Sequence, residues 1–199
     1  AYSRAGVAAF TTSTGYGIAK YDNPEELSVS DRNNIGYQYT DCPLYWISVI
    51  YLNFAEAKAE MGSLTQDDLN NSINKLQARA GLPAMTTTPD ADPANNMGVS
   101  NLIWEIRRCR RCELIMDNWY RYWDLIRWHQ LDKLDSTKYP NTMLGANVSN
   151  VPDCEEATKN GYIDASDAQI RTYEAKHYFY PIPTTQLTLN KNMKQNPGW

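Results

Sequence analysis

The charged side chains around Glu113 are the part of this sequence best suited to chemistry. Helical spacing places Glu113 on the apolar stripe of a predicted helix, and a carboxylate that faces a protein core alone is costly. Charged residues surround it on this helix and the next, namely Arg107, Arg108, Arg110, Arg111, Arg121, Asp124 and Arg127. Partners for a buried charge are therefore abundant.

Glu113 has two interpretations. In the first, desolvation raises its pKa and it acts as a general acid in glycoside hydrolysis, together with Asp124 or Asp117. In the second, it forms a structural ion-pair clamp with Arg110, Arg121 and Asp124 that joins two helices. Because a nearby arginine lowers the pKa of a carboxyl group and makes it a poor acid, we predict the clamp.

Cys109 and Cys112 form a Cys-x-x-Cys pair in the same predicted helix. A zinc site would need further ligands at matching spacing, and a redox pair would lie at a helix N-terminus, where the dipole stabilises a thiolate. This pair lies in mid-helix, so we predict buried structural thiols. With Cys42 and Cys154 the chain has four cysteines, which fix neither the redox compartment nor a disulfide pattern.

No metal or cofactor site is predicted. His129 and His177 are far apart in sequence, and each has aromatic neighbours. Asp90 and Asp92 lie in a polar loop without the ordered spacing and glycine of a calcium loop. The chain also lacks a phosphate-binding glycine loop and a nucleophile elbow.

Composition narrows the class of protein. The 199 residues are 42% hydrophobic, which can supply a core, and the net charge is -4 with a pI near 5.2. An acidic balance argues against general binding to nucleic acid. No apolar run is long enough to span a bilayer, and the first residues lack the pattern of a signal peptide, so a mature piece or a fragment is expected.

Helical periodicity begins at Pro43. Apolar residues follow two faces of the helix that ends at Gly62, which predicts burial on both sides. Thr65 and Asp68 resemble a capping arrangement for a second helix, which Gly81 closes. Residues 43–81 are thus predicted to form a helical hairpin.

A second hairpin is predicted from helices over residues 100–117 and 119–131. Residues 1–42 are expected to be mainly loop, and residues 132–175 an irregular excursion with one short helix at 165–173. The two prolines around Ile182 predict an extended, non-helical ending, docked by packing of its aromatic residues and Trp199.

Four ordered blocks, from about residue 15 to residue 199, resemble the SusD/RagB family of surface lipoproteins. The first hairpin carries Tyr51-Leu52-Asn53-Phe54-Ala55-Glu56-Ala57 and Ala78-Arg79-Ala80-Gly81-Leu82-Pro83. The second carries Ile106-Arg107, Arg110-Arg111, Glu113-Leu114, Arg121, Asp124-Leu125 and Arg127-Trp128. The others are Gly15-Tyr16 with Lys20-Tyr21, and the ending Tyr178–Pro183 with Gln195–Trp199. Cys109 and Asp117-Asn118 depart from the family pattern.

The resemblance implies a mainly α fold with tetratricopeptide-like helical hairpins and long irregular loops, corresponding to the C-terminal part of a SusD-like protein. It implies one domain, with 1–42 as a leading loop region and 43–199 as the helical part with a docked tail. It also implies surface exposure at the cell outer membrane, with a lipid anchor in an N-terminal portion outside this chain. The candidate ligand contacts are Tyr16, Tyr37, Tyr39, Asn147 and Tyr162.

The expected function is non-catalytic binding of a glycan, or of a peptide, for transfer to a TonB-dependent, SusC-like transporter. A helical-repeat scaffold between protein partners, without a ligand of its own, is the first alternative. A glycosidase that uses Glu113 with Asp124 is the second. The sequence names neither the ligand nor the cognate transporter.

Overall fold

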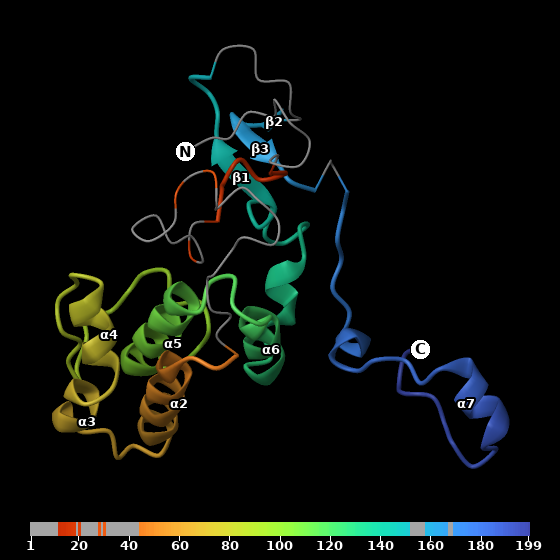
Figure 1. Ribbon diagram of the computed structural model, residues 1–199. Helices are drawn as coiled ribbons and strands as arrows, with labels where there is room; N and C mark the ends of the chain where they lie inside the picture. The colour runs from red at the N-terminus through yellow and green to blue at the C-terminus, as the bar shows by residue number, and fades with distance from the viewer. Residues whose placement is uncertain are drawn as a thin grey trace. The chain divides into compact units, whose positions relative to one another are not determined.

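The computed structural model describes residues 12–18, 20, 28, 30, 44–151, 158–166 and 169–199. It divides into two compact units, each described separately here (Figure 1). The helical unit is Cys42–Gln130, and the sheet unit combines Ala1–Asp41 with Leu131–Trp199. The fold is mainly α with long irregular segments, as predicted. The domain boundary predicted at residues 42 and 43 stays a prediction.

The first hairpin of the helical unit begins with α2, Ile47–Glu60. Gly62 follows with φ 67°, a left-handed conformation that glycine adopts without strain, and the Ser63 N–H donates to the Lys58 carbonyl at 2.9 Å. Thr65 then caps the next helix, as predicted. Its hydroxyl accepts from the Asp68 N–H, while the Asp68 carboxylate accepts from the Thr65 N–H.

The predicted second helix is two helices, α3 over Gln66–Asn70 and α4 over Ile73–Arg79. The break lies at Ser72, whose hydroxyl donates to the Asp68 carbonyl at 2.6 Å. This side chain competes with the backbone for a helical acceptor, which is why serine disfavours helix interiors. Gly81, with φ 68°, ends α4 as predicted.

The second hairpin consists of α5, Asn101–Glu113, and α6, Tyr120–Arg127. The Ser100 hydroxyl caps α5 by accepting from the Ile103 N–H at 3.3 Å. The helix ends four residues before the predicted Asp117. Three residues without the freedom of glycine then take positive φ values, namely Met116, Asn118 and Trp119 at 63°, 36° and 59°. The backbone therefore reverses direction in this turn.

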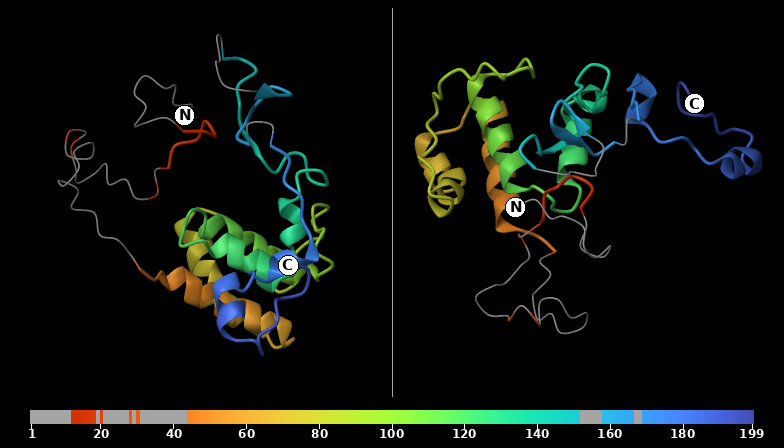
Figure 2. Two further views of the ribbon diagram at one scale, coloured as in Figure 1. Left: turned by 90° about the vertical axis from the view of Figure 1, so that its right-hand side faces the viewer. Right: turned by 90° about the horizontal axis from the view of Figure 1, so that it is seen from above.

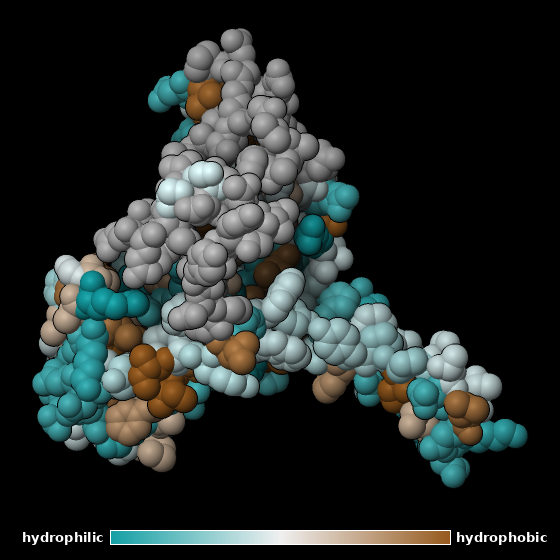
Figure 3. Space-filling model, in the orientation of Figure 1, coloured by the Kyte–Doolittle hydropathy of each residue, from teal (hydrophilic) through white to brown (hydrophobic). Residues whose placement is uncertain are grey.

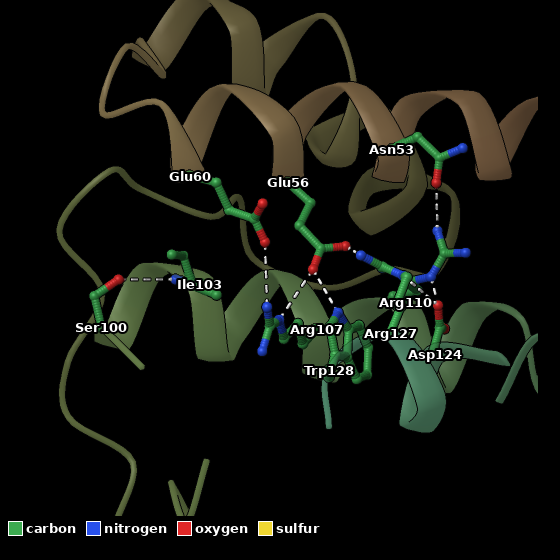
Figure 4. Close-up of polar contacts among 10 residues, drawn as sticks. All are labelled: Asn53, Glu56, Glu60, Ser100, Ile103, Arg107, Arg110, Asp124, Arg127 and Trp128. Carbon is green, nitrogen blue, oxygen red and sulfur yellow. Dashed lines mark hydrogen bonds and ion pairs between the residues drawn. The ribbon is translucent and has the colours of Figure 1, made fainter. Parts of the chain in front are cut away.

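The helical core lies between the two hairpins. Its fully buried side chains include Leu52 and Ala55 of α2, Ile73 of α4 and Ile106 of α5. α2 and α5 run side by side and antiparallel, as Figures 2 and 4 show. Apolar burial of this kind supplies roughly 25 cal/mol per Å² removed from water.

The second apolar face of α2 is exposed, so the prediction of burial on two sides is wrong. Ile50 is 60% exposed and Phe54 43% exposed. Apolar side chains gather over α2 and the segment that leads into it (Figure 3). The α5–α6 turn lies beside this segment, because the Asn118 amide donates to the Leu44 carbonyl at 3.1 Å. The turn and α6 add Ile115, Met116, Trp119 and Trp123 to the exposed apolar residues.

The sheet unit contains three short antiparallel strands, in the order β1-β3-β2. They are β1 over Leu144–Asn147, β2 over Thr158–Lys159 and β3 over Tyr162–Asp164. Ala146, Val148 and Ile163 form its small buried core. The short helix predicted at 165–173 is wrong for the described residues, because the Ala165 N–H continues the strand pairing by donating to the Met143 carbonyl at 3.0 Å.

The C-terminal segment folds back on itself. It contains two short helices, η3 over Ala175–Tyr178 and α7 over Thr184–Leu189. The prediction of a non-helical ending is wrong at α7, because a proline directly before a helix gives up only an N–H that the helix would leave unpaired. The Gln195 amide bonds both the N–H and the carbonyl of Ile182, at 2.7 and 2.9 Å.

Trp199 contacts the C-terminal segment but is only partly buried. Its indole N–H donates to the Phe179 carbonyl at 2.9 Å, and its side chain stays 47% exposed. No helix within the described part of the chain has the length and apolarity needed to cross a bilayer.

Candidate functional site

Glu56 of α2 is the centre of the charged cluster in the helical unit (Figure 4). Its carboxylate is buried and accepts hydrogen bonds from Arg107 Nε at 2.9 Å and from Trp128 Nε1 at 2.7 Å. The Arg127 guanidinium donates to its other oxygen. A single glutamate therefore joins α2 to both α5 and α6.

Asp124 of α6 forms a second centre. It accepts from Arg110 Nε at 2.7 Å and from Arg127 Nε at 3.0 Å. Arg110 also donates to the Asn53 side-chain oxygen at 2.8 Å. Because both the Arg110 and Asp124 side chains are only 5% exposed, this pair is desolvated and held by several hydrogen bonds at once.

Opposite charges neutralise these buried groups. Burial alone would raise the pKa of Glu56, but the bonds from Arg127, Trp128 and Arg107 outweigh it, so that the pKa lies below its usual value. The guanidiniums of Arg107 and Arg127 also lie over the Trp128 ring, at 4.7 and 4.8 Å from its centre. The contacts of Glu56 with Arg107, Arg127 and Trp128 are thus of a kind that stabilises the fold.

Two of the four residues predicted as one clamp form a direct ion pair. The structure brings Arg110 and Asp124 together, but Glu113 pairs with Arg79 of α4 at 2.6 Å. Arg121 is partly buried, and desolvation and the charge of Arg111 lower its pKa, while the charge of Asp124 opposes this shift. Periodicity placed Glu113 on the inward side but did not indicate its contact with α4.

Sequence reasoning missed Glu56 as the centre of the cluster. A signal was present, because Glu56 follows Leu52 by four residues and so shares its buried helical face. The glycosidase interpretation gains no support from these contacts. Glu113 and Asp124 each accept charged hydrogen bonds from arginine, which engage these carboxylates within the protein.

The two cysteines of α5 differ in their surroundings. Cys109 is buried, as predicted, and burial together with the charge of Glu113 raises the pKa of its thiol to about 12. Cys112 is exposed, so the prediction of two buried thiols is wrong for it. Cys42 and Cys154 lie outside the described residues.

The acidic loop and the histidines bind other parts of the protein. Asp92 accepts from Trp104 Nε1 at 3.0 Å, and His177 accepts from the Glu174 N–H at 3.0 Å. Among the residues that the structure describes, no group of three or more His, Cys, Asp and Glu side chains could hold a metal ion.

Three predicted ligand contacts lie on one part of the sheet unit. Asn147 of β1 pairs directly with Tyr162 of β3, and opposed residues of antiparallel strands point to the same face. Tyr16 comes close to β1 because the Thr14 carbonyl accepts from the Ala146 N–H at 2.8 Å. Tyr16, Asn147 and Tyr162 are here called the ligand face. Tyr37 and Tyr39 lie outside the described residues.

The backbone of β1 explains how the Tyr16 loop reaches the sheet. The register shifts by one residue between Leu144 and Asn147, a bulge that frees the Ala146 N–H from the strand ladder. A Cβ atom on Gly145 would lie 2.2 Å from the Thr14 carbonyl oxygen, so only glycine allows this close approach. The loop is therefore fixed to β1 by backbone contacts.

The ligand face has exposed aromatic rings and hydrogen-bond donors that could contact a ligand. Tyr16 is 60% and Tyr162 38% exposed. The Asn147 side-chain oxygen accepts from the Ser149 N–H at 3.0 Å, which fixes the amide and leaves its two N–H donors without partners among the described residues. Tyrosine rings stack on flat apolar surfaces, and an amide donates to hydroxyl or carbonyl oxygens. Such a face can bind a ligand without breaking a bond.

Sequence reasoning also missed Lys159, which pairs with Tyr162 across the β2–β3 hairpin. The signal was the Asn160-Gly161 dipeptide, which favours a two-residue hairpin turn. Both residues have positive φ, 53° and 80°, as that turn requires.

Comparison with family models identifies one family for this chain. The model of the SusD family matches residues 2–199 of this chain. A solved SusD-like protein from Bacteroides fragilis is 25% identical, with a TM-score of 0.49; the match covers 76% of this chain and 25% of that one. The chain thus spans about a quarter of the length of this relative. A search of curated proteins found no match.

Proposed function

This chain belongs to the SusD family, and from that premise we propose that it is part of a non-catalytic binding component for nutrient uptake at the cell outer membrane. Its ligand is a glycan or, as the second choice, a peptide. The bound ligand passes to a TonB-dependent, SusC-like transporter. A lipid anchor and further ligand contacts belong to an N-terminal portion of the same protein.

The ligand face is the observation that carries this proposal. The exposed Tyr162 ring and an amide whose donors have no partner among the described residues lie on one face of a small sheet, and the exposed Tyr16 lies in the loop that is bonded to β1. Stacking rings and free amide donors suit the binding of a sugar ring. The arginine-paired carboxylates of the helical unit give no comparable support to bond cleavage. Tyr37 and Tyr39 remain proposed contacts of the same ligand.

A helical scaffold is the second candidate, and the exposed apolar face of the helical unit favours it. Ile47 and Ile50 of α2 belong to this face, together with Trp119 at the α5–α6 turn. Exposed apolar patches of this kind often mark sites of protein contact. In the proposed complex, the transporter or the N-terminal portion would cover this face.

Titration calorimetry of the whole protein against soluble oligosaccharides and peptides separates the two candidates. We expect measurable binding of at least one glycan. Tyr16→Ala and Tyr162→Ala should each weaken it roughly fivefold to tenfold, because each removes an aromatic stacking surface. Tyr45→Ala is the matched control, since Tyr45 is an exposed tyrosine of the helical unit, 87% accessible.

The control should bind like the wild type. Binding that persists unchanged in both ligand-face variants would show that the ligand sits elsewhere. A null result with every glycan and peptide would leave the scaffold as the function.

A further inference from the structure

One row of side chains crosses the whole sheet. Tyr162 of β3 lies directly opposite Asn147 of β1 on one side and Lys159 of β2 on the other. Directly paired residues of antiparallel strands project to the same face. The row therefore spans two strand spacings, or about 10 Å at about 4.8 Å each, which suits more than one sugar ring.

The opposite face of the same strands is buried. Ile163 follows Tyr162 in β3 and is only 2% exposed, and it packs with Ala146 and Val148. Alternation along a strand thus sends Tyr162, with its row, toward solvent. The row is accessible to a ligand along its whole length.

Lys159 is exposed and has no carboxylate within ion-pair distance among the described residues. Two other lysines of the chain do have such partners. Lys58 pairs with Asp68 at 2.8 Å, and Lys176 pairs with Glu174 at 3.2 Å. The row therefore ends in a cation whose charge is not balanced by these residues.

The turn between β2 and β3 fixes the backbone position of Lys159. Asn160 and Gly161 form a tight connection with positive φ at both positions, which holds Lys159 opposite Tyr162. A Cβ atom on Gly161 would lie 2.1 Å from the Ser149 hydroxyl oxygen, so the turn also packs closely on the segment after β1. The Lys159 backbone is thus held beside Tyr162, and its flexible side chain carries the ammonium group over the neighbouring surface.

We propose that Lys159 is a ligand contact and that it selects an anionic glycan, a sugar with a carboxylate or sulfate group, over a neutral one. The inference rests on the proposed function. The Tyr162 ring stacks on a sugar, the Asn147 amide donates to its oxygens, and the Lys159 ammonium donates to the acidic substituent. A charge-assisted hydrogen bond of this kind is stronger than one between neutral groups.

Lysine on an edge strand also has a purely structural explanation, because it blocks pairing with a further strand. β2 is such an edge strand. The two explanations differ in what they predict for ligand choice, since edge protection has no effect on the charge preference of a bound sugar.

The test compares sugars that differ only in charge. Binding of the whole protein is measured by titration calorimetry with an oligogalacturonide and its methyl ester, and with a sulfated galactan oligosaccharide and its desulfated form. At low salt the protein should bind the charged member of one pair roughly threefold to tenfold more tightly than its neutral partner. The preference should shrink as the salt concentration rises. The pair that shows it identifies carboxylate or sulfate as the group bound.

Lys159→Gln should abolish this preference, so that the charged and neutral forms bind alike, while Lys159→Arg should retain it. Lys191→Gln, at another exposed lysine of the sheet unit, is the matched control and should behave like the wild type. Equal binding of charged and neutral partners, or a preference that survives Lys159→Gln, would overturn the inference but not the proposed function. Failure to bind any glycan or peptide would overturn the proposed function itself.

Discussion

The two units use polar side chains in opposite ways. In the helical unit, the buried carboxylates of Glu56 and Asp124 accept bonds from three arginines, and Trp128 completes the set. In the sheet unit, polar groups such as the Asn147 amide are exposed, with donors that no described residue engages. The helical unit is thus richer in residues of the types that enzymes use in catalysis, but there these side chains bond to one another.

This contrast shows that residue type alone does not identify a site. A carboxylate among arginines resembles a catalytic centre in sequence, but in the structure its hydrogen bonds to arginine hold it in place. The ligand face contains only ordinary residues, a tyrosine pair and an asparagine, which gain significance from their exposure. What matters for binding is the set of groups that folding leaves unsatisfied.

The largest effect is expected for Glu56→Gln. The variant leaves Arg107, which is only 10% exposed, with the half-exposed Glu60 as its remaining carboxylate partner. Breaking a buried ion pair in this way costs about 3–5 kcal/mol of unfolding free energy. Urea denaturation followed by far-UV circular dichroism reports this loss, because the long helices lie in the helical unit.

Glu60→Gln is the control for that experiment. Glu60 lies one helical turn further along α2 and pairs with the same arginine at 3.2 Å, but its side chain is 49% exposed. Its loss should cost less than about 1 kcal/mol. Equal effects of the two variants would break the comparison, since the helical cluster would then not depend on burial of its charges.

A smaller and more local effect is expected for Gly145→Ala. The added methyl group would collide with the Thr14 backbone, so the loop that carries Tyr16 must move away from β1. Overpacking of this kind costs about 1–3 kcal/mol. Hydrogen exchange at the Ala146 amide should become faster, because its bond to the Thr14 carbonyl is lost.

Gly17→Ala provides the control within the same loop, because no atom lies within 4 Å of its added Cβ. It should leave the Ala146 amide protected. If Gly145→Ala also leaves this amide protected, the Tyr16 loop is held by something other than β1, and Tyr16 no longer belongs with Asn147 and Tyr162.

Much of the helical unit could be predicted because its signals are local. Thr65, Gly62 and Gly81 each fix a helix end through bonds or backbone angles within a few residues. The break between α3 and α4 was missed because it depends on the Ser72 hydroxyl, which bonds a backbone carbonyl. The spacing of apolar residues gives no sign of that bond. The strands were missed because β2 and β3 have only two and three residues, too few to show an alternating pattern.

The candidate sites were less predictable than the helices. Glu56 is 51 residues from Arg107 and 71 from Arg127, so their contacts depend on how the hairpins pack. Spacing shows that a carboxylate faces inward but not which arginine meets it. The ligand face joins Tyr16 to residues more than a hundred positions away through a backbone bond, for which the sequence carries no side-chain signal.

The smallest effect is expected for Glu113→Gln, which tests the remaining enzymatic interpretation. Its partner Arg79 is 65% exposed, so solvent screens the pair and the variant should lose at most about 1 kcal/mol. A double-mutant cycle with Arg79→Gln measures the coupling of the two residues directly. The pKa of the Cys109 thiol should also fall from about 12, because the charge of Glu113 contributes to raising it.

A Cys112→Ser background makes that thiol shift measurable, since Cys109 is then the reactive cysteine of α5. Faster alkylation of Cys109 at alkaline pH, with no release of sugar from any oligosaccharide by either protein, would place Glu113 among the structural charges of the helical unit. Turnover by the wild type that Glu113→Gln abolishes would instead make the helical unit the catalytic one. The contrast between a self-neutralised helical unit and an open sheet unit would then fail, because a carboxylate paired with arginine would have proved reactive.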